Sequence, residues 1–147
     1  MRPEHLLALT GGALVAVQLA MNGQTRLALG HPLWAALANN LAGLLGLTLA
    51  LLLSGARWPG LAGLQAVPPL HWGAGLLGAG FIAISALAAP RLGLAALMVL
   101  TLCGQLLTSL LIDQLGGFGT PQRSVDLSRL GGLALVMSGT LLIAGKS

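Results

Sequence analysis

The stretch LAALMVLTLCGQLLTSLLID, residues 94–113, decides the fold of this chain. It is almost wholly apolar, and at a rise of 1.5 Å per residue a helix of this length crosses a hydrocarbon core of roughly 30 Å. Four polar residues recur at every fourth position, which places their side chains on one helix face. They are Thr101, Gln105, Ser109 and Asp113. Because lipid cannot satisfy such a stripe, we expect it to face protein or water.

The composition of the chain differs from that of a soluble domain. Of its 147 residues, 56% are hydrophobic and 7% are charged, whereas a soluble domain has about 25% charged residues. The mean hydropathy is +0.90. Seven basic residues exceed three acidic ones, but no basic cluster indicates nucleic-acid binding. The composition and length therefore predict an integral membrane protein with a single membrane domain, residues 1–147.

Five apolar segments are predicted to cross the membrane as helices. They cover approximately residues 5–24, 33–54, 70–89, 93–114 and 130–145. The connection at 55–69 is rich in Gly and Pro, and the connection at 116–129 is polar and Gly-rich. The three tryptophans lie at span ends, where the interfacial aromatic belt places them. The predicted fold class is an all-α membrane protein with five transmembrane helices per chain.

The distribution of Lys and Arg gives the chain almost no preferred orientation. Five spans place the two termini on opposite sides, so the basic residues can be assigned to sides. The N-terminal side has Arg2, Arg57, Arg123 and Arg129, and the opposite side has Arg26, Arg91 and Lys146. Because positive charge normally sets orientation, this balance favours dual topology, in which two opposed copies pair. The alternative is a fixed orientation set by a subtler feature, such as the N-terminal amine.

Side-chain amides recur in three of the predicted spans. The candidate residues for a substrate cavity are Gln18, Asn22, Asn39 and Gln105, with Ser109 beside Gln105. An amide in hydrocarbon needs hydrogen-bond partners. One interpretation is that these amides bond between helices and stabilise the bundle by about 1 kcal/mol each. The other is that they line a polar cavity near the membrane midplane, where a substrate binds.

Asp113 lies at the end of its span, next to a glycine-rich loop. A buried carboxylate could couple transport to protons. Its position at the span end favours instead a structural ion pair at the interface, with Arg123 or Arg129 as the partner.

The sequence contains no catalytic or metal-binding pattern. His5, His31 and His71 are isolated at span ends, and the lone Cys103 lies within a span. No such residues have metal-ligand spacing, and no nucleophile is accompanied by a base and an orienting group. We therefore expect no metal, no cofactor and no enzymatic activity.

Several stretches resemble the five-span, dual-topology branch of the drug/metabolite transporter superfamily, a bacterial family. They are Gln18 with Asn22, Pro32 at the start of the second span, residues 72–80 (WGAGLLGAG), residues 104–119 (GQLLTSLLIDQLGGFG) and Arg129. The resemblance covers nearly the whole chain, and residues 104–119 are its specific part. This chain departs from the family where it has Asn39-Asn40, since the family usually has Ser-Phe or similar there.

The resemblance implies an antiparallel homodimer of ten helices with inverted-repeat pseudo-symmetry about an axis in the membrane plane. It also implies a multi-pass protein of the bacterial inner membrane that transports a small drug or metabolite by alternating access. The implied partners are the lipid bilayer, a second copy in the opposite orientation and a small-molecule substrate. The alternative function is a non-transporting membrane assembly or interaction protein, whose buried amides only hold helices together.

Overall fold

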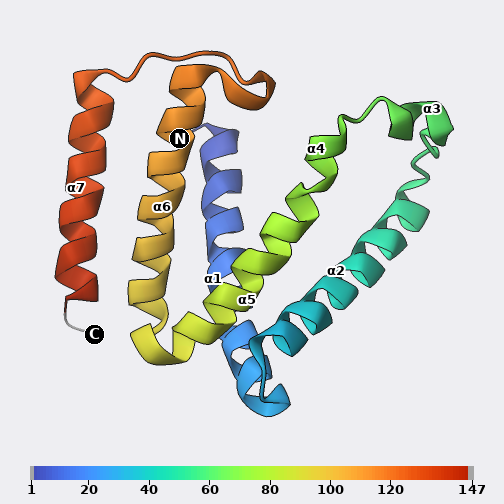
Figure 1. Cartoon of the computed structure of the whole chain (residues 1–147), viewed down its shortest axis with the longest axis horizontal. Coiled ribbons are helices and arrows are strands. Elements are labelled where there is room, and N and C mark those ends of the chain that lie inside the picture. Colours follow the sequence, from blue (N-terminus) through green and yellow to red (C-terminus); the bar gives the residue numbers. More distant parts are fainter. Residues whose placement is uncertain (1, 146–147) are drawn as a thin grey trace. The chain divides into compact units, whose positions relative to one another are not determined.

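The computed structural model describes residues 2–145 and consists of helices and their connections (Figure 1). In chain order they are α1 (Pro3–Leu29), α2 (Pro32–Ser54), α3 (Gly60–Gln65), α4 (Pro69–Trp72), α5 (Ala74–Leu92), α6 (Leu94–Leu115), the 3-10 helix η1 (Gly117–Gly119) and α7 (Leu127–Ala144). Five segments are long and apolar enough to cross a membrane: α1, α2, α4 with α5, α6 and α7. The predicted all-α class with five candidate spans is thereby confirmed for the described residues. Lys146 lies outside them.

The first helix continues to Leu29, a full turn beyond the predicted end of the span at residue 24. Its end is set by Gly30, which adopts the left-handed conformation (φ 76°) and donates its N–H to the carbonyl of Arg26. Arg26 thus lies inside the last turn, where a cation interacts favourably with the helix dipole. The charge ends the apolar part of the segment but not the helix.

The last helix begins at Leu127, a turn before the predicted start at residue 130. Asp126 caps it, because the Asp126 carboxylate accepts a hydrogen bond of 2.8 Å from the N–H of Arg129. Such a cap satisfies one of the N–H groups that the first turn leaves without an intrahelical partner. Arg129 is therefore a residue of the first turn and not of the loop.

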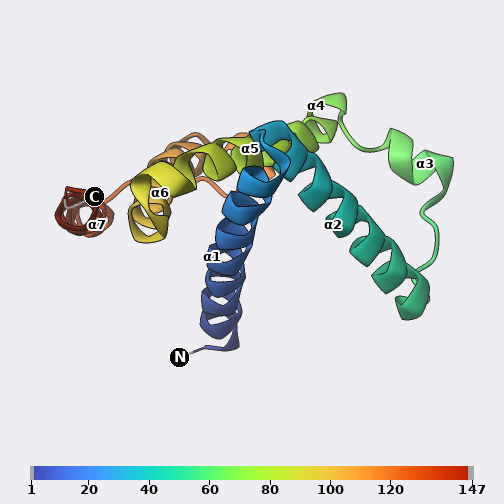
Figure 2. The same cartoon turned by 90° about the horizontal axis from the view of Figure 1, so that it is seen from below.

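The described chain divides into two compact units, residues 2–87 and 88–145. In the first unit, α1 and α2 are joined only by Gly30 and His31 and diverge from that turn (Figure 2). His31 caps α2 by accepting a hydrogen bond from the N–H of Leu33, and Pro32 occupies the first helical position, as predicted. The buried residues of this unit come from α1, α2 and α5: Leu19, Asn22, Gly23, Ala35, Ala36, Ile82, Ser85 and Ala86.

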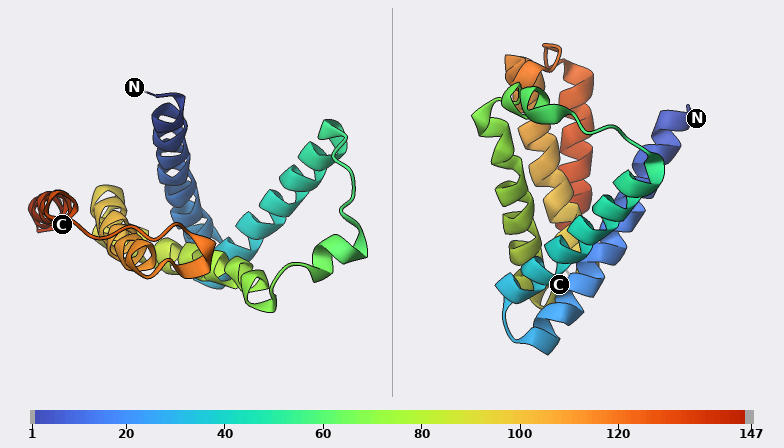
Figure 3. Two further views of the ribbon diagram at one scale, coloured as in Figure 1. Left: turned by 90° about the horizontal axis from the view of Figure 1, so that it is seen from above. Right: turned by 90° about the vertical axis from the view of Figure 1, so that its right-hand side faces the viewer.

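In the second unit, α6 and α7 lie side by side and run in opposite directions (Figures 1 and 3). Thr140 is buried between them: its hydroxyl donates to the carbonyl of Val136 at 2.9 Å and lies 3.0 Å from the sulfur of Cys103. The loop that joins the two helices is held by Gln114. Its side-chain oxygen accepts from the N–H of Val125, and its carbonyl accepts from the side chain of Gln122.

Long apolar side chains of the spans remain largely exposed within each unit. Leu52 and Leu53 of α2 are 76% and 79% exposed, and Leu76 and Leu77 of α5 are each 78% exposed. In water, a continuous apolar surface of this kind would associate or aggregate. In a bilayer, lipid chains or another protein surface cover it, which agrees with five membrane spans.

We predict that the Asp126 cap weakens on acidification. The pKa of Asp126 lies below its ordinary value of 3.8, because the N–H of Arg129 and then the hydroxyl of Ser128 bond the ionised carboxylate. A lowered pKa stabilises the folded state above 3.8, and this contribution is lost as the pH falls through the folded-state pKa. Amide exchange at Arg129, relative to its intrinsic rate, should therefore accelerate below that pH.

The matched control for this prediction is Asp126→Asn, which keeps a cap acceptor but does not titrate. Its exchange at Arg129 should show no corresponding acid-dependent step. The same acid-dependent step in Asp126→Asn and in the unmodified protein would show that another group is responsible.

Candidate functional site

A cavity of about 370 Å³ in the first unit is lined by α1 and by Asn39 of α2. Three predicted site residues line it: Gln18, Asn22 and Asn39. The remaining lining residues are Leu14, Val17, Met21 and Thr25. The volume lies at the lower end of the range for small-molecule pockets, about 300–1,000 Å³. The apolar lining side chains Leu14, Val17 and Met21 are 67%, 59% and 64% exposed, so the cavity is open along these side chains and is not enclosed.

The first and second helices are linked at this cavity by a hydrogen bond between two of the amides. Gln18 Nε2 donates to Asn39 Oδ1 at 3.0 Å, and both side chains are half-buried. The bond leaves both amides with unused capacity: Gln18 keeps its carbonyl oxygen and one N–H, and Asn39 keeps its NH₂ group. The pair therefore joins the helices and still offers donors and acceptors.

Asn22 follows Gln18 by one helical turn and is the most buried of the three amides, at 4% exposure. Its Nδ2 has no hydrogen-bond partner among residues 2–145. A buried donor without a partner costs about 1–3 kcal/mol, so this group has a strong tendency to acquire one. A fully satisfied set of interhelical bonds would not leave such a donor.

Thr25 is a lining residue that was not among the predicted site residues. Its hydroxyl donates to the carbonyl of Met21 at 3.0 Å, which leaves the oxygen lone pairs available as acceptors. Thr25 lies seven residues after Gln18, a spacing that returns to the same helix face. That spacing is the signal from which the sequence could have identified it.

Gln105 and Ser109 lie on α6 in the second unit and do not line this cavity. Both side chains are exposed. The Ser109 hydroxyl donates to the carbonyl of Leu106 at 3.0 Å, whereas the Gln105 amide has no partner within residues 2–145. A shared cavity that includes these two residues stays a prediction.

Asp113 is paired with Arg129 across the α6–α7 connection. Arg129 Nη1 lies 3.3 Å from Asp113 Oδ2, and about a third of each side chain is exposed. Arg123, the other predicted partner, contacts Asp113 through the backbone: its N–H donates to the Asp113 carbonyl at 2.8 Å. A partly exposed pair of this kind contributes only about 0–1 kcal/mol. It lies at the end of the α6–α7 pair where the connecting loop begins.

The α1–α2 cavity has no charged side chain in its lining. The nearest basic residue along α1 is Arg26, which lies one turn beyond Asn22 and is not part of the lining. Within residues 2–145, no three His, Cys, Asp or Glu side chains come close enough together to hold a metal ion. What the cavity offers a ligand is hydrogen bonding from amides and contact with apolar side chains.

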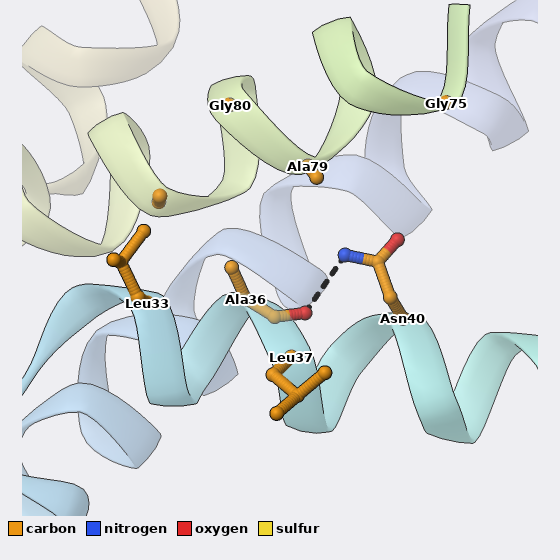
Figure 4. Close-up of a pocket in the computed structure, with 8 residues that line it drawn as sticks. Leu33, Ala36, Leu37, Asn40, Gly75, Ala79 and Gly80 are labelled. Atoms are coloured by element: carbon orange, nitrogen blue, oxygen red, sulfur yellow. Dashed lines mark hydrogen bonds between the residues drawn. The ribbon is translucent and has the colours of Figure 1, made fainter.

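A second pocket of about 390 Å³ lies between α2 and α5 within the first unit (Figure 4). Its α5 side is formed by small residues, among them Gly75, Ala79 and Gly80. Asn40 Nδ2 donates to the carbonyl of Ala36 on its own helix at 2.8 Å (Figure 4). Unlike Asn22, Asn40 therefore has an internal partner for its donor. Small residues in a membrane helix commonly allow close helix packing.

Comparison with known proteins identifies one family. The family model described as "Putative inner membrane exporter, YdcZ" matches residues 5–142. The matched range contains all five candidate spans in large part, all cavity residues and the Asp113–Arg129 pair. Neither a curated protein nor a solved structure matches the chain.

We predict that Gln18 and Asn39 are energetically coupled. Gln18→Leu and Asn39→Leu should each lower the free energy of unfolding by about 1 kcal/mol, because each leaves the other amide without its partner. The double variant should lose less than the sum, with a coupling energy of about 0.6 kcal/mol. Equilibrium unfolding in SDS–detergent mixtures measures these values.

Asn40→Leu is the matched control for this cycle, since the Asn40 amide bonds within its own helix. It should show no coupling to Gln18→Leu. Additive effects of the Gln18 and Asn39 substitutions would contradict the interhelical hydrogen bond.

Proposed function

The chain belongs to this family of inner membrane exporters, and on that basis we propose that it carries a small molecule across the membrane. It is a multi-pass inner-membrane protein of a transporter family, not of an enzyme family. We further propose that it belongs to the drug/metabolite transporter superfamily. The substrate binds in the α1–α2 cavity, at Gln18, Asn22 and Asn39.

The observation that carries this proposal is the unpaired amide of Asn22 at the cavity. If the amides served only to hold helices together, their donors would be used between helices, as in the Gln18–Asn39 bond. Asn22 Nδ2 is instead buried and without a partner among residues 2–145. A cavity that a polar ligand enters provides that partner during transport.

We also propose that the working unit is an antiparallel homodimer with dual topology. The nearly equal numbers of basic residues on the two sides support insertion in both orientations. The exposed amide of Gln105 also supports a dimer. It lies within a span, is costly in lipid and has no partner among residues 2–145, so a second protein surface would have to provide one. Two opposed copies then form an inverted repeat that alternates access to the cavity.

In such a dimer, Gln105 and Ser109 contribute to the substrate pathway together with the α1–α2 amides. The alternative is a non-transporting assembly protein, in which these polar groups only stabilise contacts between copies. The Gln18–Asn39 bond is compatible with both functions, whereas the unpaired Asn22 donor favours transport.

Gln105→Leu separates the two functions. In proteoliposomes, we expect the unmodified protein to move at least one member of a panel of labelled amino acids, nucleobases, sugars and hydrophobic cations. We expect Gln105→Leu to abolish that flux while crosslinking still detects the dimer. Thr108→Val, on the same exposed helix, is the control and should retain flux. Loss of the dimer in Gln105→Leu supports the assembly function instead, and absence of flux for the whole panel contradicts transport.

Lysines in the 55–69 connection test dual topology. Replacing Ala56, Leu61 and Gln65 by Lys should fix one orientation, because added positive charge is retained on the cytoplasmic side. Flux should fall when this variant is expressed alone. It should recover when the variant is co-expressed with a chain that carries three added lysines around Pro90, which fixes the opposite orientation. Undiminished flux from the first variant alone would rule out the antiparallel dimer.

A further inference from the structure

We infer that the α1–α2 cavity selects uncharged small molecules that present a hydrogen-bond donor beside an acceptor. Carboxamides, lactams, ureas and heterocyclic bases are molecules of this class. The inference rests on the proposed transport function and deepens it by naming the chemistry of the substrate. Three properties of the cavity lead to it: its unused hydrogen-bonding groups, its lack of charge and its size.

The unused groups at the cavity include both donors and acceptors. The bond between Gln18 and Asn39 uses one N–H and one lone pair. It leaves the Gln18 carbonyl oxygen as an acceptor and the Asn39 NH₂ group as a donor. Thr25 adds an acceptor, because its only hydrogen is donated to Met21. A ligand with only donors or only acceptors would leave part of this set unsatisfied.

Asn22 adds a complete carboxamide whose NH₂ group has no protein partner within residues 2–145. A carboxamide bonds best to a group with an acceptor and a donor side by side, as Asn does to the edge of adenine. Pairing with such a group would remove the cost of the buried donor, about 1–3 kcal/mol. Asn22 Nδ2 is covered in the free protein, so a ligand reaches it only when the Asn22 side chain rotates or α1 and α2 separate.

A charged substrate finds no counter-ion in this cavity. Its lining consists of three amides, one hydroxyl and the apolar side chains of Leu14, Val17 and Met21. Transfer of an ion into such surroundings without a paired charge is far more costly than transfer of a neutral polar group. Arg26, one turn away from Asn22, is the only cation close along α1 and stays outside the lining. A volume of about 370 Å³ suits a small molecule.

The inference is tested with probes of similar shape and different charge. Nicotinamide and uracil are neutral and carry adjacent donors and acceptors, nicotinate and orotate are their anionic counterparts, and 1-methylnicotinamide is a cation. Binding of tritiated nicotinamide to the full-length protein in lipid nanodiscs is measured by scintillation proximity, with the other compounds as competitors. We expect both neutral compounds to bind at least about tenfold more tightly than the ions, the difference that 1.4 kcal/mol produces.

Substitutions at Asn22 test whether this residue causes the preference for neutral ligands. Asn22→Leu should weaken nicotinamide binding about tenfold, because the group that pairs with the ligand is removed. Asn40→Leu is the matched control, because Asn40 lines the α2–α5 pocket and not the α1–α2 cavity. It should leave binding unchanged. Asn22→Asp should shift the preference toward 1-methylnicotinamide. This preference is a ratio, so it does not depend on how much of the variant folds.

The possible outcomes distinguish the inference from the proposed function. Protein-dependent flux of an ion, with no binding of either neutral probe, overturns the inference and leaves transport standing. Asn22-dependent binding of nicotinamide without flux of any probe supports the inference and contradicts transport. Absence of binding by both neutral probes overturns the inference. Equal loss of binding in Asn22→Leu and Asn40→Leu also overturns it.

Discussion

A side-chain amide within hydrocarbon must find a hydrogen-bond partner, and this constraint governs the first unit of the protein. Gln18 and Asn39 meet it by bonding to each other at 3.0 Å, which links α1 to α2 at the cavity. Asn22, one turn along, does not meet it within residues 2–145. The same chemistry thus produces a structural contact at one position and an unsatisfied group at the next. This contrast is the physical basis for assigning a binding site.

The second unit meets the same constraint mainly through local bonds. The hydroxyls of Ser109 and Thr140 donate to carbonyls of their own helices, and Asp113 pairs with Arg129 where α6 and α7 are connected. Gln105 differs from these residues, with an exposed amide and no partner in residues 2–145. Polar groups that bond within their own helix need no neighbour. An amide that makes no bond within its own helix must obtain its partner from another protein surface or from water.

Apolar side chains and side-chain amides have different roles in the spans. Exposed leucines favour contact with lipid, whereas small residues such as those of α5 at the α2–α5 pocket favour close approach of helices. Neither feature carries substrate specificity. Under the proposed function, specificity would depend on a few polar side chains among many apolar ones, which is why substitution of one amide is informative in this protein.

The sequence by itself determined that the chain is helical and has five candidate membrane spans, because hydropathy and span length are properties of consecutive residues. It also singled out Gln18, Asn22 and Asn39 as candidate site residues, and all three line the α1–α2 cavity. The helices α1 and α7 extend beyond the predicted spans, since Arg26 and Arg129 fit inside terminal turns through the helix dipole and the Asp126 cap. Only the tertiary structure decided that Gln18 bonds Asn39, that Asn22 is left unpaired and that Arg129 rather than Arg123 pairs with Asp113. Such pairings depend on how two helices approach and on the path of a loop, and residue spacing within one helix does not specify either.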